Sequence, residues 1–468
     1  MTHLGFGRYT LGLVAAVAML AGCGGASPLG TAGQVPRLDS GSDSSPSPIQ
    51  HVVLIIQENR TFNDFFATFP GGDGTTTGKA EKVHETGCSV SKTTIKLKER
   101  NLVVEPDLNH EYQAFSIALN GGKLNGFDKI NSQNDKPECK FPYQYTDPAQ
   151  IQPYWDMAEQ YALAEHMFAT QGSSSFVAHQ DLIRGGTNID STYAIVNDPT
   201  HYPWGCDAPK NTKTSLIDVN DKLYPMQGPF PCTKDFPSSG SSYATLRDLL
   251  DAKYVTWKYY VPPMNEIFGK LMSAFDVIAP VRYGPEWKTN VITPQTAIFK
   301  DISDGSLANM SWVIPDEPDS DHPGESVDDG PQWVASVVNA IGESSYWNST
   351  AIIIVWDDWG GLYDNMVGTQ KYGFGSLGLR VPAIIVSPYA KAGYISKTAY
   401  EFGSVLKYIE ENWDLGSLGT TDRTSKHSII DCFDYLQNPI TFKPIASSLD
   451  KEYFIRRKPS LLPIDDDM

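Results

Sequence analysis

Two pairs of oxygen-bearing side chains directly follow two strongly apolar segments, residues 51–57 and 351–356. The four residues are Glu58, Asn59, Asp357 and Asp358. Carboxylate and amide oxygens are the ligands that hard divalent cations require. A helix cap or a solvated turn would account equally well for the aspartate pair taken alone. Because the same pattern occurs at the ends of two apolar segments, a shared metal site is the favoured interpretation.

A serine-rich segment, residues 171–175, is the natural candidate for a nucleophile. Small residues ahead of a hydroxyl allow phosphate to approach closely, and a helix that begins near Phe176 would direct its amide groups at negative charge. Ser173, Ser174 and Ser175 are consecutive, so the local sequence does not decide among them. A serine-rich turn that caps a helix is the alternative for the first two.

Nine histidines occur in the chain, and two of them lie in polar loops that contain proline. His110 directly precedes a helical stretch. His322 lies in an acidic loop, residues 315–323, whose carboxylates favour a protonated ring and therefore a proton donor. A surface histidine is the alternative for either residue. His166 and His179 lie in apolar helical stretches, where a structural role is expected.

The elements around these residues predict an α/β fold. Apolar runs rich in β-branched residues at 51–57, 351–356 and 381–386 predict strands buried on both faces, as in a parallel sheet covered by helices. Open α/β sheets bind ligands at the carboxyl ends of their strands, which is where the polar pairs lie. Thr61 could cap a helix that begins at Phe62. Further helices are predicted at residues 153–168, 245–252, 331–343 and 401–413.

The remaining organisation indicates one large domain, residues 49–468. Residues 70–104 and 187–240 are rich in Gly, Ser, Pro, Asn and Thr and lack periodicity. We expect them to be loop-rich insertions at the rim of that domain. No internal repeat is evident.

Residues 1–23 have the pattern of an export signal. An apolar run, residues 11–20, is too short to span a bilayer and ends in small residues. Its Leu-Ala-Gly-Cys ending resembles a bacterial lipobox, so we expect a lipid anchor on Cys23, with a plain signal peptide cut near Ala26 as the alternative. Residues 24–48, rich in Gly, Ser and Pro, would form a tether. The sequence thus predicts an exported protein, either a cell-envelope lipoprotein in the periplasm or on the outer surface, or a secreted protein.

Five cysteines follow the lipobox, and disulfides are expected in an oxidising compartment. Cys206 and Cys232 flank one loop-rich stretch and are the best pair. Cys88 with Cys139 is the second suggestion, which leaves Cys432 free. No CxxC pair occurs, so a zinc knuckle is not indicated.

The formal net charge of −18 argues against a broad nucleic-acid-binding surface, because phosphate backbones need a basic face. An acidic enzyme can still act on phosphate esters when a bound cation offsets the local charge.

Four segments resemble a bacterial phosphoesterase family of the phospholipase C and acid phosphatase type. They are residues 51–66, 153–187, 312–347 and 351–388, and ENRTF and WDDWGG are their specific motifs. The resemblance covers nearly all of the expected mature chain. It implies an alkaline-phosphatase-like α/β fold, with a mostly parallel central sheet covered by helices on both faces and loop-rich insertions.

The resemblance also implies one divalent metal ion and a covalent mechanism. The metal ligands would be Glu58, Asn59, Ser175, Asp357 and Asp358. Ser175 would be the nucleophile, and His110 and His322 would be catalytic histidines. All-oxygen ligation favours calcium, magnesium or manganese. The chain departs from the family in two places: Val177 stands where a proline is common, and Asn365 stands where a histidine is common.

The predicted function is that of an exported, metal-dependent phosphoric ester hydrolase with a phosphoseryl intermediate. The substrate would be a phospholipid head group or a small phosphomonoester. Residues 414–468 are too short for the extension of larger phospholipases in this family, which favours a phosphatase, whereas a lipid anchor and aromatic loops favour a phospholipase. A sulfatase is weakly indicated, because no Cys/Ser-x-Pro-x-Arg motif surrounds Ser175. A non-catalytic, metal-binding surface lipoprotein is the alternative from another class.

Overall fold

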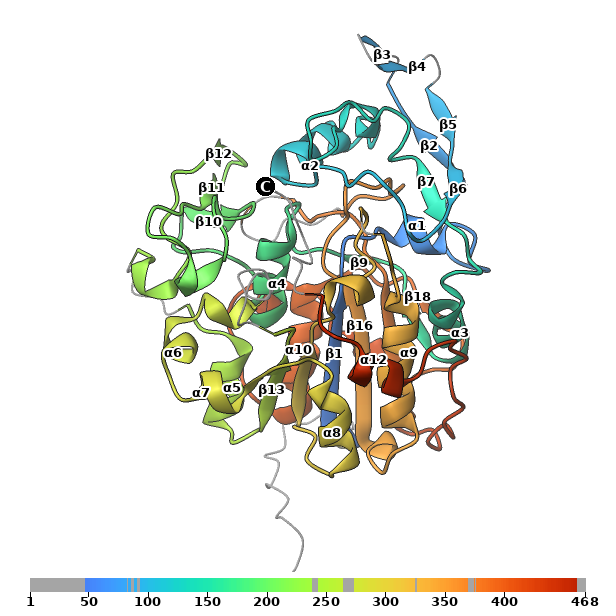
Figure 1. Cartoon of the computed structure of the whole chain (residues 1–468), viewed down its shortest axis with the longest axis vertical. Helices are drawn as coiled ribbons and strands as arrows, with labels where there is room; N and C mark the ends of the chain where they lie inside the picture. The colour runs from blue at the N-terminus through green and yellow to red at the C-terminus, as the bar shows by residue number, and fades with distance from the viewer. Residues whose placement is uncertain are drawn as a thin grey trace, which may run out of the picture. The chain divides into compact units, whose positions relative to one another are not determined.

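In the computed structural model, an eight-stranded mixed sheet organises the chain, with the order β14-β13-β15-β1-β16-β17-β8-β18 (Figure 1). The structure describes residues 47–460 apart from 82, 86, 87, 91, 92, 238–242, 264–272, 325, 369–373 and 375. The predicted signal peptide, its Cys23 and residues 24–46 of the tether lie outside the described residues.

Most neighbouring strands of this sheet run parallel. The strands, in spatial order, are Val291–Ile292 (β14), Trp257–Tyr260 (β13), Met310–Val313 (β15), His51–Gln57 (β1), Thr350–Trp356 (β16), Ala383–Val386 (β17), Ala162–Ala164 (β8) and Tyr394–Ser396 (β18). Only β17 runs antiparallel to its neighbours, β16 and β8. The predicted α/β class with a mostly parallel sheet is confirmed.

The two long central strands are the ones predicted from apolar runs. Every residue of β16 is buried, and so is every residue of β1 after His51. Strands buried on both faces require cover on both sides, and β-branched side chains suit the pleated, crowded surface. β1 and β16 are parallel neighbours, in register from His51 with Thr350 to Gln57 with Trp356. Their carboxyl ends therefore lie at the same level.

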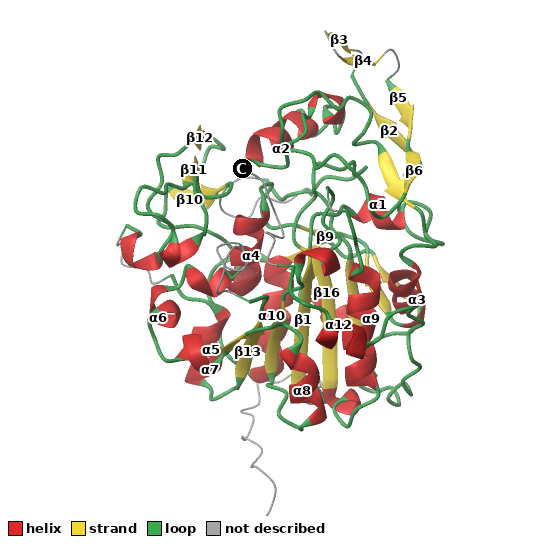
Figure 2. Ribbon diagram, in the orientation of Figure 1, coloured by secondary structure: helices red, strands yellow, loops and turns green. Residues whose placement is uncertain are grey.

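Helices pack in two groups against this sheet (Figure 2). One group contains Gln152–Gln160 (α3), Ala297–Ser303 (α8), Gly330–Gly342 (α9) and Lys451–Arg456 (α12). The other contains Ser175–Arg184 (α4), Leu246–Ala252 (α5) and Phe402–Trp413 (α10). The predicted helices at 245–252, 331–343 and 401–413 are confirmed as α5, α9 and α10. The short helix Phe62–Phe66 (α1) is also confirmed, because the Thr61 side chain caps it by accepting from the Asp64 N–H.

The predicted helix 153–168 is correct only in its first part. α3 ends at Gln160, and the chain then forms β8 in the central sheet and a short strand, Met167–Phe168 (β9). β8 pairs with β17 on one side and with β18 on the other. Long-range strand pairing therefore overrides the local helical pattern over these residues.

The predicted insertions carry small elements of their own. Those within residues 70–104 are Thr77–Lys79 (β2), Val83–Glu85 (β3), Cys88–Val90 (β4), Thr94–Lys96 (β5) and Lys98–Arg100 (β6). Tyr112–Leu119 (α2) and Gln144–Thr146 (β7) follow this segment. Between 187 and 240 they are Tyr193–Val196 (β10), Ser215–Asp218 (β11) and Leu223–Tyr224 (β12), which form one small sheet. The other short elements are Ala279–Arg282 (α6), Glu286–Thr289 (α7), Tyr400–Glu401 (β19) and Thr421–Thr424 (α11). In Figure 1 both insertions lie above the main sheet, at the end where β1 and β16 finish.

The cysteine predictions are confirmed where the structure describes them. A disulfide joins Cys206 to Cys232, and Cys432 is buried and free. The suggested pair of Cys88 with Cys139 needs the side chain of Cys88, which lies outside the described part. Within residues 47–460, as far as they are described, no helix is both long and apolar enough to cross a bilayer.

Candidate active site

The two polar pairs lie side by side at the carboxyl ends of β1 and β16. Gln57 and Trp356 form the last pair of the ladder, so Glu58 and Asp357 are each the first residue beyond their strand. The Asp357 N–H donates to the Gln57 carbonyl over 2.9 Å, which continues the pairing by one residue. All four side chains of the two pairs are buried from solvent.

Ser175 is the first residue of α4, and its hydroxyl points at this group. The Oγ lies 3.3 Å from Glu58 Oε2, 3.1 Å from Asn59 Oδ1 and 3.2 Å from Asp358 Oδ2. The structure thus brings the predicted nucleophile together with the predicted metal ligands, which come from segments more than a hundred residues apart in sequence.

The other two serines of the run have different surroundings. Ser173 Oγ accepts a hydrogen bond from the Asn197 N–H over 2.8 Å, and Ser174 is the residue before α4 begins. The predicted helix is present as α4, and one of its first amides already has a partner, because the Phe176 N–H donates to Asp198 Oδ1 over 3.1 Å.

Asn59 adopts a left-handed backbone conformation with φ of 52°, which asparagine tolerates better than most residues. In this conformation its N–H donates to Asp357 Oδ1 over 2.9 Å. Gly360 packs directly against the other side of Asn59. A Cβ at Gly360 would lie 2.1 Å from the Asn59 carbonyl oxygen, so only glycine permits this approach.

The two predicted catalytic histidines both reach the Asn59 amide. The amide nitrogen Nδ2 lies 3.1 Å from His110 Nε2 and 2.8 Å from His322 Nε2. The Nδ1 atoms of the two rings lie 2.7 Å from the Leu108 carbonyl and 2.6 Å from the Pro323 carbonyl. Because a carbonyl only accepts, each Nδ1 carries a hydrogen. In the neutral rings each Nε2 is then an acceptor, which matches a donating amide.

The orientation of the Asn59 amide indicates whether a cation lies among the carboxylates. With Nδ2 toward the histidines, Asn59 Oδ1 faces Asp357 Oδ1 at 3.0 Å and Glu58 Oε2 at 3.3 Å. Oxygens that cannot donate repel one another at such distances unless a cation lies between them. The reversed amide would relieve this repulsion only if both rings also carried hydrogen on Nε2. The site therefore fits a metal ion together with neutral histidines.

Asp357 supports the same conclusion. Its Oδ1 accepts from the N–H groups of Asn59 and Asp358, whereas its Oδ2 is buried and has no hydrogen-bond partner among the described residues. Burial and the negative charge of Glu58 raise the pKa of Asp357 to about 8. An ionised carboxylate at this position needs a positive partner, and a bound cation would supply it.

A buried aspartate fixes the loop that carries His322. Asp321 Oδ2 accepts from Tyr154 Oη at 2.6 Å, from Trp356 Nε1 at 2.9 Å and from Gln57 Nε2 at 3.2 Å. Two of these donors are the last residues of β1 and β16, so the loop is tied to the strands that carry the site. Burial raises the pKa of Asp321 to about 6. The acidic composition of the loop did not reveal this anchoring contact.

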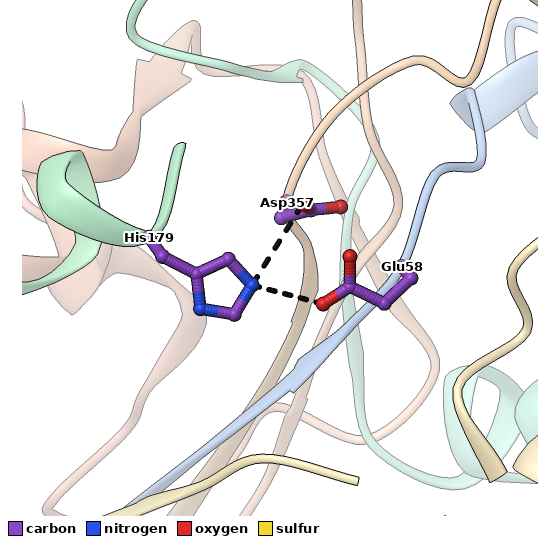
Figure 3. A group of neighbouring side chains, drawn as sticks. All are labelled: Glu58, His179 and Asp357. Carbon is purple, nitrogen blue, oxygen red and sulfur yellow. Dashed lines mark hydrogen bonds and ion pairs between the residues drawn. The ribbon is translucent and has the colours of Figure 1, made fainter. Parts of the chain in front are cut away.

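His179 belongs to the site, contrary to the expectation of a purely structural role. It lies one helical turn after Ser175 on α4, and residues four apart share a helix face. Its Nε2 is 2.9 Å from Glu58 Oε1 and 3.8 Å from Asp357 Oδ2 (Figure 3). The spacing of four residues between Ser175 and His179 could have indicated this role, but the apolar neighbours of His179 favoured a structural one.

His166 lies in a different cluster and not in a helix. With Asp73 and Glu165 it offers a second set of possible metal ligands. Lys397 already occupies that cluster, because its Nζ lies 2.9 Å from Asp73 Oδ1 and 3.3 Å from Glu165 Oε1. The ammonium group supplies the positive charge that these carboxylates need.

Comparison with known proteins identifies the family. The model of the phosphoesterase family matches residues 49–416, most of the chain. This chain belongs to the phosphoesterase family. Membership confirms the predicted family. The candidate metal-binding groups lie within the matched segment of this phosphoesterase.

Similar curated proteins are phospholipases C of greater length. Non-specific phospholipase C4 from Arabidopsis thaliana is 22% identical over 75% of this chain and 64% of that protein. Non-specific phospholipase C3 from the same plant is 24% identical over 77% of this chain and 67% of that protein. Hemolytic phospholipase C from Pseudomonas aeruginosa is 25% identical over 78% of this chain and 53% of that protein. The phosphoesterase thus spans between about half and two thirds of these relatives.

Among solved structures, a protein in the alkaline phosphatase superfamily from Vibrio parahaemolyticus is similar to the phosphoesterase. The match has a TM-score of 0.37 and 12% identity, over 83% of this chain and 73% of that chain. A TM-score this low marks a remote likeness.

Proposed function

We propose that this phosphoesterase is a metal-dependent hydrolase that cleaves phosphoric esters through a phosphoseryl intermediate on Ser175. One observation carries the proposal. The Ser175 hydroxyl lies at the N-terminus of α4, within 3.3 Å of oxygen atoms of three proposed metal ligands. A binding protein has no need for a nucleophilic hydroxyl in this position.

The residues that would hold the ion are Glu58, Asn59, Asp357 and Asp358, with Ser175 as a further ligand. When bound, a divalent cation lowers the pKa of a neighbouring hydroxyl and offsets the charge of the phosphoryl oxygens. The observed arrangement fits such a role, since Asn59 Oδ1 faces oxygens of Asp357 and Glu58, and Asp357 Oδ2 has no hydrogen-bond partner among the described residues.

In the first step, each side chain takes part in transferring the phosphoryl group to Ser175. Ser175 Oγ forms a bond to phosphorus while the bond from phosphorus to the leaving oxygen breaks. The hydroxyl proton passes to Asp358 Oδ2, which is 3.2 Å away. His322, once protonated on Nε2, gives that proton to the leaving oxygen. His110 Nε2 accepts from the Asn59 amide and so holds the amide oxygen toward the carboxylates.

In the second step, water attacks the phosphorus of the phosphoserine. The phosphorus–Oγ bond breaks, the phosphoryl group leaves with the water oxygen, and Ser175 Oγ takes its proton back from Asp358 Oδ2. His322, now neutral with an unprotonated Nε2, takes the proton from the attacking water. The contacts of Nδ1 with the Pro323 carbonyl hold the ring in the tautomer that this step requires.

For the substrate we favour a phosphodiester of the phospholipid head-group type. The support is the comparison, because the three reported relatives are all named phospholipases C. A small phosphomonoester is the other outcome of the test below. Export and a lipid anchor on Cys23 are part of the same proposal, and rest on the lipobox-like sequence alone. Labelling cells with a fatty acid tests the anchor, which the Cys23→Ser variant should not carry.

The deciding experiment measures hydrolysis of para-nitrophenyl phosphorylcholine beside para-nitrophenyl phosphate, with and without a chelator. We expect turnover that a chelator abolishes and that Ser175→Ala lowers by about 10³-fold or more. Ser173→Ala and Ser174→Ala are matched controls, and each should retain activity within a few-fold. Preference for the diester supports the phospholipase C assignment, and preference for the monoester indicates a phosphatase. If neither ester is hydrolysed with any added metal, the non-catalytic lipoprotein becomes the better explanation.

A further inference from the structure

We propose that His179 supplies a nitrogen ligand to the metal centre, so that the site prefers a first-row transition-metal ion such as zinc or manganese over calcium. This inference rests on the proposed function and sharpens it, because it names the class of ion. It modifies the expectation of calcium, magnesium or manganese, which rested on oxygen ligands alone, by adding zinc and disfavouring calcium.

The position of His179 is set by the same helix that positions the nucleophile. Ser175 and His179 are four residues apart on α4, and the whole of this helix is buried. Their side chains therefore leave the same face of the helix toward the ends of β1 and β16. Figure 3 shows the imidazole from α4 meeting the carboxylates that follow the two strands.

Three ligand atoms converge at this point. Glu58, His179 and Asp357 each offer one ligand atom, and these three atoms all lie within 4.8 Å of one another. The individual separations from Nε2 are 2.9 Å to the glutamate oxygen and 3.8 Å to the aspartate oxygen. Ligand atoms at about 2.0–2.2 Å from zinc, at a tetrahedral angle, lie about 3.4 Å apart. The observed separations bracket that value, so a small ion fits with minor adjustment.

A simple hydrogen bond from His179 to Glu58 is the competing explanation. It accounts for the 2.9 Å contact, but it leaves Asp357 Oδ2 without a partner. A buried carboxylate oxygen without a donor or a cation is strongly unfavourable as a charged group. Ligation of one ion by all three atoms satisfies Asp357 as well, which is why we favour it.

The Glu58 carboxylate divides its two oxygens between His179 and Ser175. Glu58 presents Oε1 to His179 and Oε2 to Ser175 Oγ. The imidazole therefore contributes from the side of the centre away from the nucleophile, and need not compete with the substrate for space. Imidazole is a good ligand for zinc and other transition metals, whereas calcium is bound almost wholly by oxygen.

The test compares metal binding by the metal-free wild type and by His179→Gln. The glutamine retains a hydrogen-bond donor and adds an oxygen, so it preserves a hydrogen-bonding role and removes only the nitrogen ligand. His427→Gln, which changes an exposed histidine, is the matched control. Isothermal titration with zinc chloride and with calcium chloride gives the two affinities. Pulsed electron paramagnetic resonance with manganese detects a directly bound ¹⁴N nucleus.

We expect the wild type to bind zinc at least about 100-fold more tightly than calcium, and His179→Gln to lose zinc affinity by about 10- to 100-fold or more with little change for calcium. The ¹⁴N coupling should be present in the wild type and in His427→Gln and absent in His179→Gln. Absence of this coupling from the wild type, or its persistence in His179→Gln, overturns the inference. Equal losses of zinc and calcium affinity would also overturn it and would indicate the hydrogen-bonding role.

These readouts are independent of the proposed reaction. Ester hydrolysis by a wild type whose metal has no nitrogen ligand would contradict the role of His179 and leave the proposed function standing. A nitrogen-ligated metal in a protein that hydrolyses neither test ester would support the role of His179 and contradict the proposed function.

Discussion

Replacement of Gly360 by alanine tests whether close packing positions the metal-site asparagine. Gly360 has φ of +55° and follows the second aspartate of the WDDWGG motif by two residues. An alanine Cβ there would lie 2.1 Å from the Asn59 carbonyl oxygen and 3.1 Å from the Asn59 Cβ. Neither atom belongs to a flexible side-chain end, so the backbone of one of the two segments must move.

The size of the effect follows from this geometry. Ordinary contact between carbon and a neighbouring heavy atom begins at about 3.4 Å, so the segments must separate by about 1 Å. A displacement of about 1 Å in a catalytic constellation lowers the rate by about 100-fold, equivalent to about 2.7 kcal/mol of transition-state stabilisation. The positive φ adds about 1–2 kcal/mol of destabilisation to the folded state.

Gly121→Ala is the matched control, because Gly121 has φ of +65° and an added Cβ would meet nothing within 4 Å. Both variants should lose a similar amount of unfolding free energy from the backbone strain, measured by urea denaturation. Only Gly360→Ala should lose about 100-fold in kcat/KM with para-nitrophenyl phosphorylcholine. If Gly360→Ala is folded and its kcat/KM stays within threefold of the wild type, rigid packing against Asn59 does not position the site.

Three further predictions concern the support of the site and the stability of the fold. Tyr154→Phe removes the hydroxyl that donates to Asp321, so the unfolding free energy should fall by about 1–3 kcal/mol in urea denaturation; an unchanged value would refute the anchoring role. Burial and a neighbouring carboxylate raise the pKa of Glu410 from 4.5 to about 8, so its contribution to stability is present at low pH and is lost as pH rises through this window. The melting temperature of Glu410→Gln should therefore fall less steeply with rising pH than that of the wild type, between pH 5 and about 8. Parallel dependence of the two melting temperatures on pH would contradict this. Cys206→Ser opens the loop that the disulfide to Cys232 closes over 26 residues, at an expected cost of about 3–4 kcal/mol in non-reducing urea denaturation.

The sequence predicts the centre of the fold well because buried parallel strands carry a strong local signal. The runs at 51–57 and 351–356 are apolar throughout, and they become β1 and β16. β8 shows the limit of local patterns. Its three residues continue an apparently helical stretch, and only pairing with β17 and β18 makes them a strand. Such pairing depends on segments more than two hundred residues away.

The site shows the same division between local and long-range information. Glu58 and Asp357 were recognisable because each follows a buried strand, and their register could be expected from a parallel sheet. His179 was missed because its neighbours are apolar, although its spacing of four residues from Ser175 places both on one helix face. The anchoring role of Asp321 depends on donors from two strands and a helix. No local pattern contains that information.

The most direct test of the account is to trap the covalent intermediate. The enzyme is mixed with excess para-nitrophenyl phosphorylcholine, quenched in acid during turnover, digested, and its peptides are analysed by mass spectrometry. The account predicts a phosphorylcholine group on Ser175, since para-nitrophenolate leaves and the choline ester stays on phosphorus, and this adduct should be absent from Ser175→Ala and from enzyme treated with chelator. Phosphorylation of another residue during turnover, or full turnover by Ser175→Ala, would contradict it.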